Sequence, residues 1–332
     1  MQKIAIVGAG FCGLALAFNL SSHLEVTLID SLPIGGGTSG MAAGLLHPFA
    51  GAHSKLNWRG FEGYQATCEL LDIASHSLTR SVIGQKGILR LALNADQQLD
   101  YSRCADAYPS EVKWLQSEQV QELYCHLVAA PGLWIEKGLI VHSSLYLEGL
   151  WKACAGRVRF VQSKVHSLAE LDEYDQVVLA AGGTVNQFSE LASCCLTALK
   201  GQVLTLRWPE GISPLTLAVN SYVYALMSES KQTCLVGGTF ERNYHCLEPD
   251  IEYAKKELLP KLEAMLPVLT GAKVVECRAG VRSVTPTHLP LVQQFGPQQW
   301  VIAGMGSKGL LYHALMAKEL ANLILGFFKN HH

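Results

Sequence analysis

The sequence predicts an α/β protein in which a parallel, Rossmann-like nucleotide-binding domain is interleaved with a mainly antiparallel α+β domain. Three observations predict this fold. The first thirty residues form a strand, a glycine turn, a helix and a second strand; βα alternation returns over residues 143–183; and short β runs separated by turns fill residues 201–239. Alternating strands and helices favour a parallel sheet, whereas successive β runs favour antiparallel pairing.

The opening segment carries the strongest signal. Apolar β runs at residues 3–7 (KIAIV) and 25–29 (EVTLI) flank an apolar helix. In the G-x-G-x-x-G turn between them, Gly8 allows the tight turn, Gly10 lets a pyrophosphate approach the backbone, and Gly13 lets the helix pack on the strand. Asp30 ends the second strand and can accept hydrogen bonds from a ribose. Together these features predict a nucleotide-binding βαβ unit.

Composition limits the class of protein. The chain has 332 residues, 49% of them hydrophobic and 16% charged, which suits a large buried core and argues against disorder. Its formal net charge of −2 provides no overall basic field. Affinity for nucleic acid would therefore need a local basic patch.

Membrane insertion, secretion and metal binding are not expected. The N-terminal apolar run carries glycines at nucleotide-binding spacing, so we interpret it as structure rather than as a leader. The most apolar late segment, residues 310–328, contains Lys318 and Glu319. Ten cysteines form no C-x-x-C pair and twelve histidines show no zinc spacing, which favours free thiols in a reducing cytoplasm and no metal.

The rest of the chain is interpreted from its periodicity. We expect helices at residues 61–81, 111–115, 117–123, 143–154 and 251–266, and at the C-terminus. Strands are expected at residues 87–93, 158–162, 176–179 and 299–302, with further β runs in GQVLTLRW, SYVYALM and CLVGGT. Ala181 and Gly182 follow an apolar strand, where small residues leave room for a nucleotide.

Two further glycine clusters interrupt this pattern. The first, residues 38–44 (TSGMAAG), suits either a flexible surface loop or a backbone packed against a planar, partly apolar ligand. The apolar residues that follow it favour a loop packed into the interior. The second cluster, residues 304–309 (GMGSKG), precedes the last helix. It suits either a helix cap or a site where backbone amides and Lys308 stabilise negative charge.

Residues 278–286 (RAGVRSVTP) place arginine in an otherwise apolar strand. A buried arginine needs a partner, so Arg282 has two equally supported interpretations: a salt bridge to a neighbouring acid, or a bidentate contact with a substrate carboxylate. Tyr222 and Tyr224 lie two residues apart, so both are expected on one face of a strand. They suit either core packing or a hydrogen bond to substrate.

Taken in order, these motifs resemble the D-amino-acid-oxidase-like family of FAD-dependent oxidoreductases, of the glycine and sarcosine oxidase type. The motifs GAGFCG, GGTSGMAAGLLHP, VVLAAGG, LKGQVL, LVGGTFE, RAGVRSVTPTHLPLV and AGMGSKGL occur in family order over most of the chain. TSGMAAGLLHPF, GVRSVTPTHLPLV and GMGSKGL are most similar to the oxidase domain of a bifunctional methylaminomethyl-thiouridine tRNA-modifying enzyme.

The resemblance implies noncovalent FAD and assigns positions to it. The nucleotide part would lie at Gly8, Ala9, Gly10, Phe11, Cys12, Gly13, Asp30, Ser31, Val165, Ala181 and Gly182. The isoalloxazine ring would lie beside Thr38, Ser39, Ala43, Gly44, Leu45 and His47. Its pyrimidine edge would face Gly306, Ser307, Lys308, Gly309 and Leu310. Arg282 would bind a substrate carboxylate, with Tyr224 and, less closely matched, Tyr222 on the substrate side; Ser307 replaces a second basic contact of glycine oxidase.

The resemblance also implies a domain division and an activity. Residues 1–82, 143–198 and 273–332 would form the FAD-binding domain, and residues 83–142 and 199–272 the substrate domain. The implied reaction oxidises the C–N bond of a small amino acid or N-alkylglycine by hydride transfer to the flavin. Two alternatives stay open, a tRNA wobble-uridine side-chain oxidase and a non-catalytic or subunit flavoprotein of a dehydrogenase complex. The expected location is cytoplasmic, and oligomeric state stays open.

Overall fold

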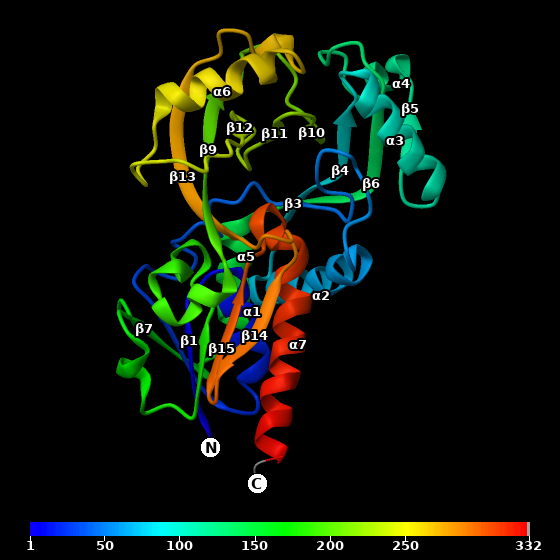
Figure 1. The fold of residues 1–332 in the computed structure, drawn as a ribbon. Coiled ribbons are helices and arrows are strands. Elements are labelled where there is room, and N and C mark those ends of the chain that lie inside the picture. The colour runs from blue at the N-terminus through cyan, green and yellow to red at the C-terminus, as the bar shows by residue number, and fades with distance from the viewer. Residues whose placement is uncertain (331–332) are drawn as a thin grey trace.

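The computed structural model describes residues 1–330, which fold around two sheets (Figure 1). The first sheet has six strands in the order β14-β15-β8-β1-β2-β7. Strands β15, β8, β1, β2 and β7 are parallel, and β14 is antiparallel to β15. Their bounds are β1 Lys3–Val7, β2 Glu25–Asp30, β7 Val158–Gln162, β8 Gln176–Leu179, β14 Leu291–Gly296 and β15 Gln299–Ala303. The predicted parallel sheet is thereby confirmed.

Helices cover one face of this sheet and short 3₁₀ segments cover the other. The helical layer contains α1 (Phe11–Leu20), α2 (Gly60–Leu78), α5 (Ser143–Ala153) and α7 (Gly309–Asn330), which share one hydrophobic core. Seven of the ten α1 residues are buried because the helix lies between the sheet and α7. The opposite face packs against η1 (Leu168–Leu171), η2 (Gly182–Gln187) and η3 (Ser189–Cys194).

The C-terminal helix, red in Figure 1, is long and apolar enough to cross a membrane if length and composition alone are considered. The segment that meets this test is Gly306–Lys329, of 24 residues. In the structure, however, 61% of its most apolar window is buried, and it packs against α1 and α2. These contacts favour a core helix of a folded domain over a membrane span.

The second sheet has nine strands and is almost entirely antiparallel. Its order is β13-β9-β12-β11-β10-β4-β6-β3, with β5 paired to β6. Within residues 1–330, the β10–β4 pair is the only parallel pair of this second sheet. The bounds are β3 Leu45–Leu46, β4 Ile83–Leu91, β5 Lys113–Leu115, β6 Gly132–Val141, β9 Thr197–Arg207, β10 Ala218–Asn220, β11 Tyr224–Met227, β12 Thr233–Gly237 and β13 Val274–Val284.

Helices outside the first layer cover this second sheet. They are α3 (Ala95–Ala107), α4 (Ser117–Leu123) and α6 (Ile251–Glu263), with a short η4 (Pro267–Leu269). Asn94 and Asp250 cap α3 and α6 by accepting backbone hydrogen bonds. Strand pairing places β3 and β13 in this sheet, although both lie in residue ranges that we assign to the FAD-binding domain. The domain division itself stays a prediction.

Two sequence-based expectations were wrong. The predicted helix at residues 111–115 is instead strand β5, because Lys113–Leu115 pairs with β6. The run SYVYALM is not one strand: β10 and β11 form a hairpin with Asn220 opposite Tyr224, so Tyr222 lies in the connecting turn. Tertiary pairing decided both cases, and it is not visible in local periodicity.

Candidate functional site

The predicted nucleotide turn lies at the carboxyl ends of the parallel strands β1 and β2. Gly8 has φ +115°, and a Cβ atom there would overlap the carbonyl of Ala180 after β8. Asp30 closes the turn, since its Oδ2 accepts from the Ala9 N–H at 2.7 Å and its Oδ1 accepts from the Leu32 N–H at 2.9 Å. A carboxylate has about four acceptor positions, so Asp30 retains capacity for a ribose hydroxyl.

The N-terminus of α1 is open to an anion. Its N-cap, Gly10, provides no side-chain cap, and the first turn carries no acid. The Phe11 N–H donates to Ser39 Oγ at 3.1 Å, which brings the 38–44 loop to this helix end. Burial raises the pKa of Cys12 to about 12, so its thiol stays uncharged beside the helix terminus. The helix dipole therefore favours a phosphate here.

The remaining predicted nucleotide residues lie after neighbouring strands of the same sheet. Ser31 is exposed after β2, Val165 is half-buried after β7, and Ala181 and Gly182 follow β8. A Cβ atom at Gly182 would meet open space, although its φ of +56° favours glycine. The structure thus places these residues along one sheet edge, where a ligand of this fold class binds.

The first of the two further glycine clusters is half-buried over residues 38–43 and buried at Gly44. Gly44 has φ +81°, and a Cβ atom there would overlap the Val141 carbonyl. The Val141 N–H donates to the Gly44 carbonyl at 2.8 Å, and Leu45 pairs with Ile140. Ala43 is half-buried beside them. The loop therefore lies against the second sheet, as expected for a backbone that faces a planar ligand.

The second cluster is held to the end of β13. The Gly304 N–H donates to Ser283 Oγ at 2.9 Å, and Met305 bridges to Val284. From there, η5 (Gly306–Lys308) leads directly into α7. The residues at this junction are Gly306, Ser307, Lys308, Gly309 and Leu310.

Lys308 is the one cation in this turn. It is half-buried, and its ammonium has no hydrogen bond or ion pair within residues 1–330. Burial lowers its pKa from the usual value. An unpartnered, partly desolvated cation beside a helix N-terminus suits an anionic ligand edge.

Arg282 and Tyr224 share one face of the second sheet. Along β13, β9, β12 and β11, the register pairs Val203 with Gly237 and Gly237 with Tyr224. The Tyr224 ring lies over Gly237, and the Arg282 guanidinium lies over Gly201, because a Cβ atom at either glycine would overlap these side chains. Burial raises the pKa of Tyr224 above its usual value, so its hydroxyl stays protonated.

Arg282 has no acidic partner. Its guanidinium donates to the Thr239 carbonyl at 3.0 Å and lies 4.9 Å from the centre of the Phe240 ring. Among residues 1–330 it forms no ion pair with an Asp or Glu. The sequence reasoning did not identify Thr239 and Phe240 as neighbours of Arg282, although both belong to the quoted motif LVGGTFE. Of the two interpretations of Arg282, the salt bridge is thus excluded within the described chain.

Tyr222 does not join this group. It is 51% exposed, and its hydroxyl accepts from Asn94 Nδ2 at 2.5 Å, at the start of α3.

His47 is buried with no partner for its Nδ1 atom. Burial, with a smaller effect from Arg90, lowers the pKa of His47 to about 3, so the imidazole is neutral.

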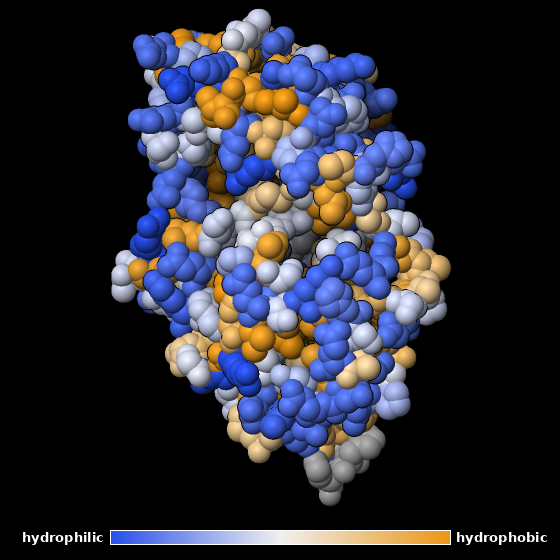
Figure 2. Space-filling model, turned by 90° about the vertical axis from the view of Figure 1, so that its left-hand side faces the viewer, coloured by the Kyte–Doolittle hydropathy of each residue, from blue (hydrophilic) through white to orange (hydrophobic). Residues whose placement is uncertain are grey.

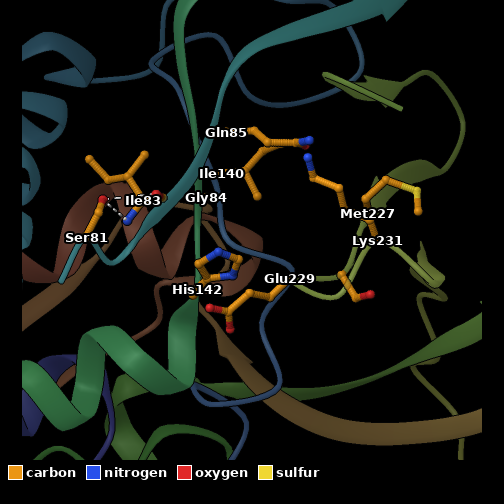
Figure 3. Close-up of a pocket in the computed structure, with 10 residues that line it drawn as sticks. Ser81, Ile83, Gly84, Gln85, Ile140, His142, Met227, Glu229 and Lys231 are labelled. Carbon is orange, nitrogen blue, oxygen red and sulfur yellow. Dashed lines mark hydrogen bonds between the residues drawn. The ribbon is translucent and has the colours of Figure 1, made fainter. Parts of the chain in front are cut away.

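Two separate pockets, of about 240 and 250 Å³, contain none of the predicted site residues. Figure 3 shows one of about 240 Å³ where the β4 and β6 strands meet the β11–β12 turn. The His142 ring and the Glu229 carboxylate both lie at its edge. Glu229 is ion-paired with Arg80 at 2.7 Å, so the pocket holds no free acid of its own. We therefore locate the candidate site at the glycine clusters instead.

The residues present fit a bound dinucleotide with a planar ring system. The α1 terminus, whose N-cap Gly10 has no side chain to cap it, suits a pyrophosphate, and Gly44 lets the backbone of the 38–44 loop pack closely against Val141. Figure 2 shows the surface hollowed between the parts built on the two sheets. Hydrogen bonds join the α1 terminus to Ser39, Thr38 to Val281 and Gly304 to Ser283, so three separate segments converge on the residues that flank Arg282.

Comparison with known proteins identifies the family of the chain. The profile of the FAD dependent oxidoreductase family matches residues 3–323. Similar proteins include the tRNA 5-methylaminomethyl-2-thiouridine biosynthesis bifunctional proteins of Thiobacillus denitrificans, 28% identical, and of Polaromonas sp., 29% identical. These alignments cover 98% and 95% of this chain but only 56% and 55% of those proteins.

Solved structures show the same fold. Glycine oxidase from Geobacillus kaustophilus aligns with a TM-score of 0.85 and 20% identity, over 98% of this chain and 95% of that one. L-proline dehydrogenase from P. horikoshii aligns with a TM-score of 0.82 and 17% identity, over 98% and 93%. The family match spans nearly the whole chain. The chain therefore belongs to the FAD dependent oxidoreductase family and is an FAD-dependent enzyme.

Proposed function

We propose that this enzyme oxidises the C–N bond of a small amino acid or N-alkylglycine, with Arg282 binding the substrate carboxylate. The observation that carries this proposal is the environment of Arg282. Its guanidinium is largely desolvated and has no acidic partner in the described chain. Arg282 also follows Val281 directly in sequence, and Val281 contacts the 38–44 loop. A buried guanidinium is stabilised by an anion, and a carboxylate matches its fork geometry.

Tyr224 completes the proposed carboxylate site. Its hydroxyl lies on the same sheet face as Arg282 and remains a hydrogen-bond donor, since burial raises its pKa. When bound, FAD supplies a two-electron acceptor for a hydride from the carbon beside the nitrogen. Arg282 and Tyr224 would hold the substrate carboxylate, and this would keep the reacting carbon in one orientation.

We further propose that FAD is bound noncovalently. Cys277 is the cysteine nearest to the arginines along β13, but it alternates with Arg278 and so lies on the opposite face of the strand. Its thiol contacts Gln202 Oε1 at 3.7 Å, and burial raises its pKa. A protonated thiol on the other face is poorly placed to attack a flavin.

The test is reconstitution with FAD followed by turnover of glycine, sarcosine, D-alanine, D-proline and proline, with peroxide and a dye acceptor measured in parallel. Arg282→Ala should raise KM at least tenfold for carboxylate substrates while flavin content stays constant, and Arg282→Lys should recover part of the loss. Arg159→Ala, an exposed arginine on β7, is the matched control. Absence of flavin binding, or unchanged kinetics in Arg282→Ala, would overturn the proposal.

A second candidate is the same chemistry on the carboxymethylaminomethyl side chain of a tRNA wobble uridine. The names of the similar bifunctional proteins favour it. Of the cations that could contact RNA, Lys55 is exposed, but Arg59 is paired with Glu62 and Glu319. Binding of tRNA that weakens steeply with salt, and is lost in Lys55→Glu, would select this candidate; no salt-sensitive binding would reject it.

A further inference from the structure

A second arginine lies on the same sheet face as Arg282. Arg278 is four residues earlier on β13, so both side chains leave the strand on one side. The register continues from Arg278 to Val203, then to Gly237 and Tyr224. Arg278 and Tyr224 therefore stand at the two ends of one cross-strand row, and a Cβ atom at Gly237 would meet both the Tyr224 hydroxyl and the Val203 side chain.

Electrostatics support this arrangement. The positive charges of Arg282 and Arg278 both act on the Tyr224 hydroxyl and partly offset the rise in its pKa that burial causes. Four strand residues span about 13 Å, so the two guanidinium groups can contact opposite ends of one small molecule. Between them, Gly280 is covered by Met41 and Thr38 of the 38–44 loop.

The ion pair between Arg278 and Glu276 is weak. Its Nε lies 3.5 Å from Glu276 Oε2, yet this buried nitrogen makes no hydrogen bond in the described structure. The two side chains are 36% and 53% exposed. An ion pair with this exposure and geometry contributes at most about 1 kcal/mol, so an incoming anion can displace it.

We propose that Arg278 is a specificity-determining residue that binds a second anionic group, carried on the nitrogen substituent of the substrate. Arg282 then holds the α-carboxylate, and the C–N bond lies between the two arginines. This inference rests on the proposed function. It narrows the substrate class from any small amino acid to N-substituted glycines whose far end is anionic.

The experiment compares two matched substrates. One is glycine with a carboxypropyl group on nitrogen; the other carries a carbamoylpropyl group, which has the same shape but no charge. In the wild type, kcat/KM should be higher for the anionic compound. Arg278→Gln should reduce the anionic-to-neutral ratio of kcat/KM about tenfold or more, while flavin content stays within about twofold of the wild type.

Glu276→Gln provides a control of opposite sign. It removes the competing carboxylate, so the same ratio should rise, and Arg278→Lys should retain part of it. An unchanged ratio in Arg278→Gln, or an equal loss for both substrates, would overturn the role of Arg278. If the wild type turns over neither compound, the proposed function fails separately, and calorimetric binding of the two compounds to the flavin-loaded protein then decides whether Arg278 selects the anionic one.

Discussion

The Thr38 hydroxyl forms two hydrogen bonds with Val281, a residue 243 positions away in sequence. It donates to the Val281 carbonyl at 2.9 Å and accepts from the Val281 N–H at 3.1 Å. Thr38 belongs to the loop expected beside the isoalloxazine, and Val281 precedes Arg282. The 38–44 loop and Arg282 are therefore held in a fixed position relative to each other.

Removing this link should weaken both folding and cofactor binding. Thr38→Val leaves the Val281 N–H and carbonyl without their partner, so we expect a loss of about 1 to 3 kcal/mol in the free energy of unfolding and several-fold weaker FAD binding. Urea unfolding and flavin fluorescence titration measure these effects. Thr38→Ser keeps the hydroxyl and should stay close to the wild type. Equal behaviour of the two variants would contradict the proposed coupling.

The close approach of α1 to β1 gives a sharper test of the nucleotide turn. A Cβ atom at Gly13 would overlap the Gly8 carbonyl, whereas one at Gly37 would meet nothing within 4 Å. Gly13→Ala should cost about 3 kcal/mol or more of stability and abolish FAD retention during purification, because backbone must shift. Gly37→Ala should change stability by less than about 0.5 kcal/mol. Normal flavin content in Gly13→Ala would argue against this turn as the cofactor site.

Lys308 should influence the reduction potential of bound FAD. If the ammonium stabilises negative charge on the reduced ring, Lys308→Met should lower the midpoint potential by about 30 mV, which corresponds to about 1.4 kcal/mol for two electrons. Lys308→Arg retains the charge and should show a smaller shift. Dye-coupled spectrophotometric titration gives both values. An unchanged potential in Lys308→Met would place the ammonium away from the ring.

The buried imidazole of His313 predicts how stability depends on pH. Its Nδ1 lies 3.1 Å from the carbonyls of Gly309 and Leu310 and so carries the proton, while Nε2 accepts from the Tyr146 hydroxyl at 2.7 Å. Burial lowers the pKa of His313 from 6.5 to about 4. Between these values the unfolded chain binds more protons, so stability falls as pH decreases.

The expected size can be measured by urea unfolding at pH 7.5 and pH 5. His313 should contribute about 2 kcal/mol to the loss of stability over this interval, and His47 should act in the same direction because its pKa is also lowered. His313→Gln should reduce the pH-dependent loss by roughly that amount, whatever its effect at pH 7.5. The same pH dependence in His313→Gln and the wild type would contradict this assignment.

Local patterns predicted the first sheet well because its signals are local. The strands at residues 3–7, 158–162 and 176–179 agree with β1, β7 and β8, since each is a short apolar run bounded by turn residues. Strand β5 was mistaken for a helix because three residues of KWL carry no period, and only their pairing with β6 defines them.

The candidate site was predictable in part for the same reason. Glycine spacing identified the turns, but the partners of Arg282 depend on register between β9, β12 and β13, which one sequence does not reveal. Thr239 and Phe240 were missed on this account. Arg278 was visible as a second arginine, yet only the strand register places it on the face shared with Tyr224.

Gly201 and Gly237 lie directly beneath the Arg282 and Tyr224 side chains. The missing side chains at these two positions leave the space in which the Arg282 guanidinium and the Tyr224 ring lie. A methyl group at either position would overlap the side chain above it and force that side chain to move. Substitution of Gly201 or Gly237 would thus alter the proposed carboxylate site while Arg282 and Tyr224 themselves stay unchanged.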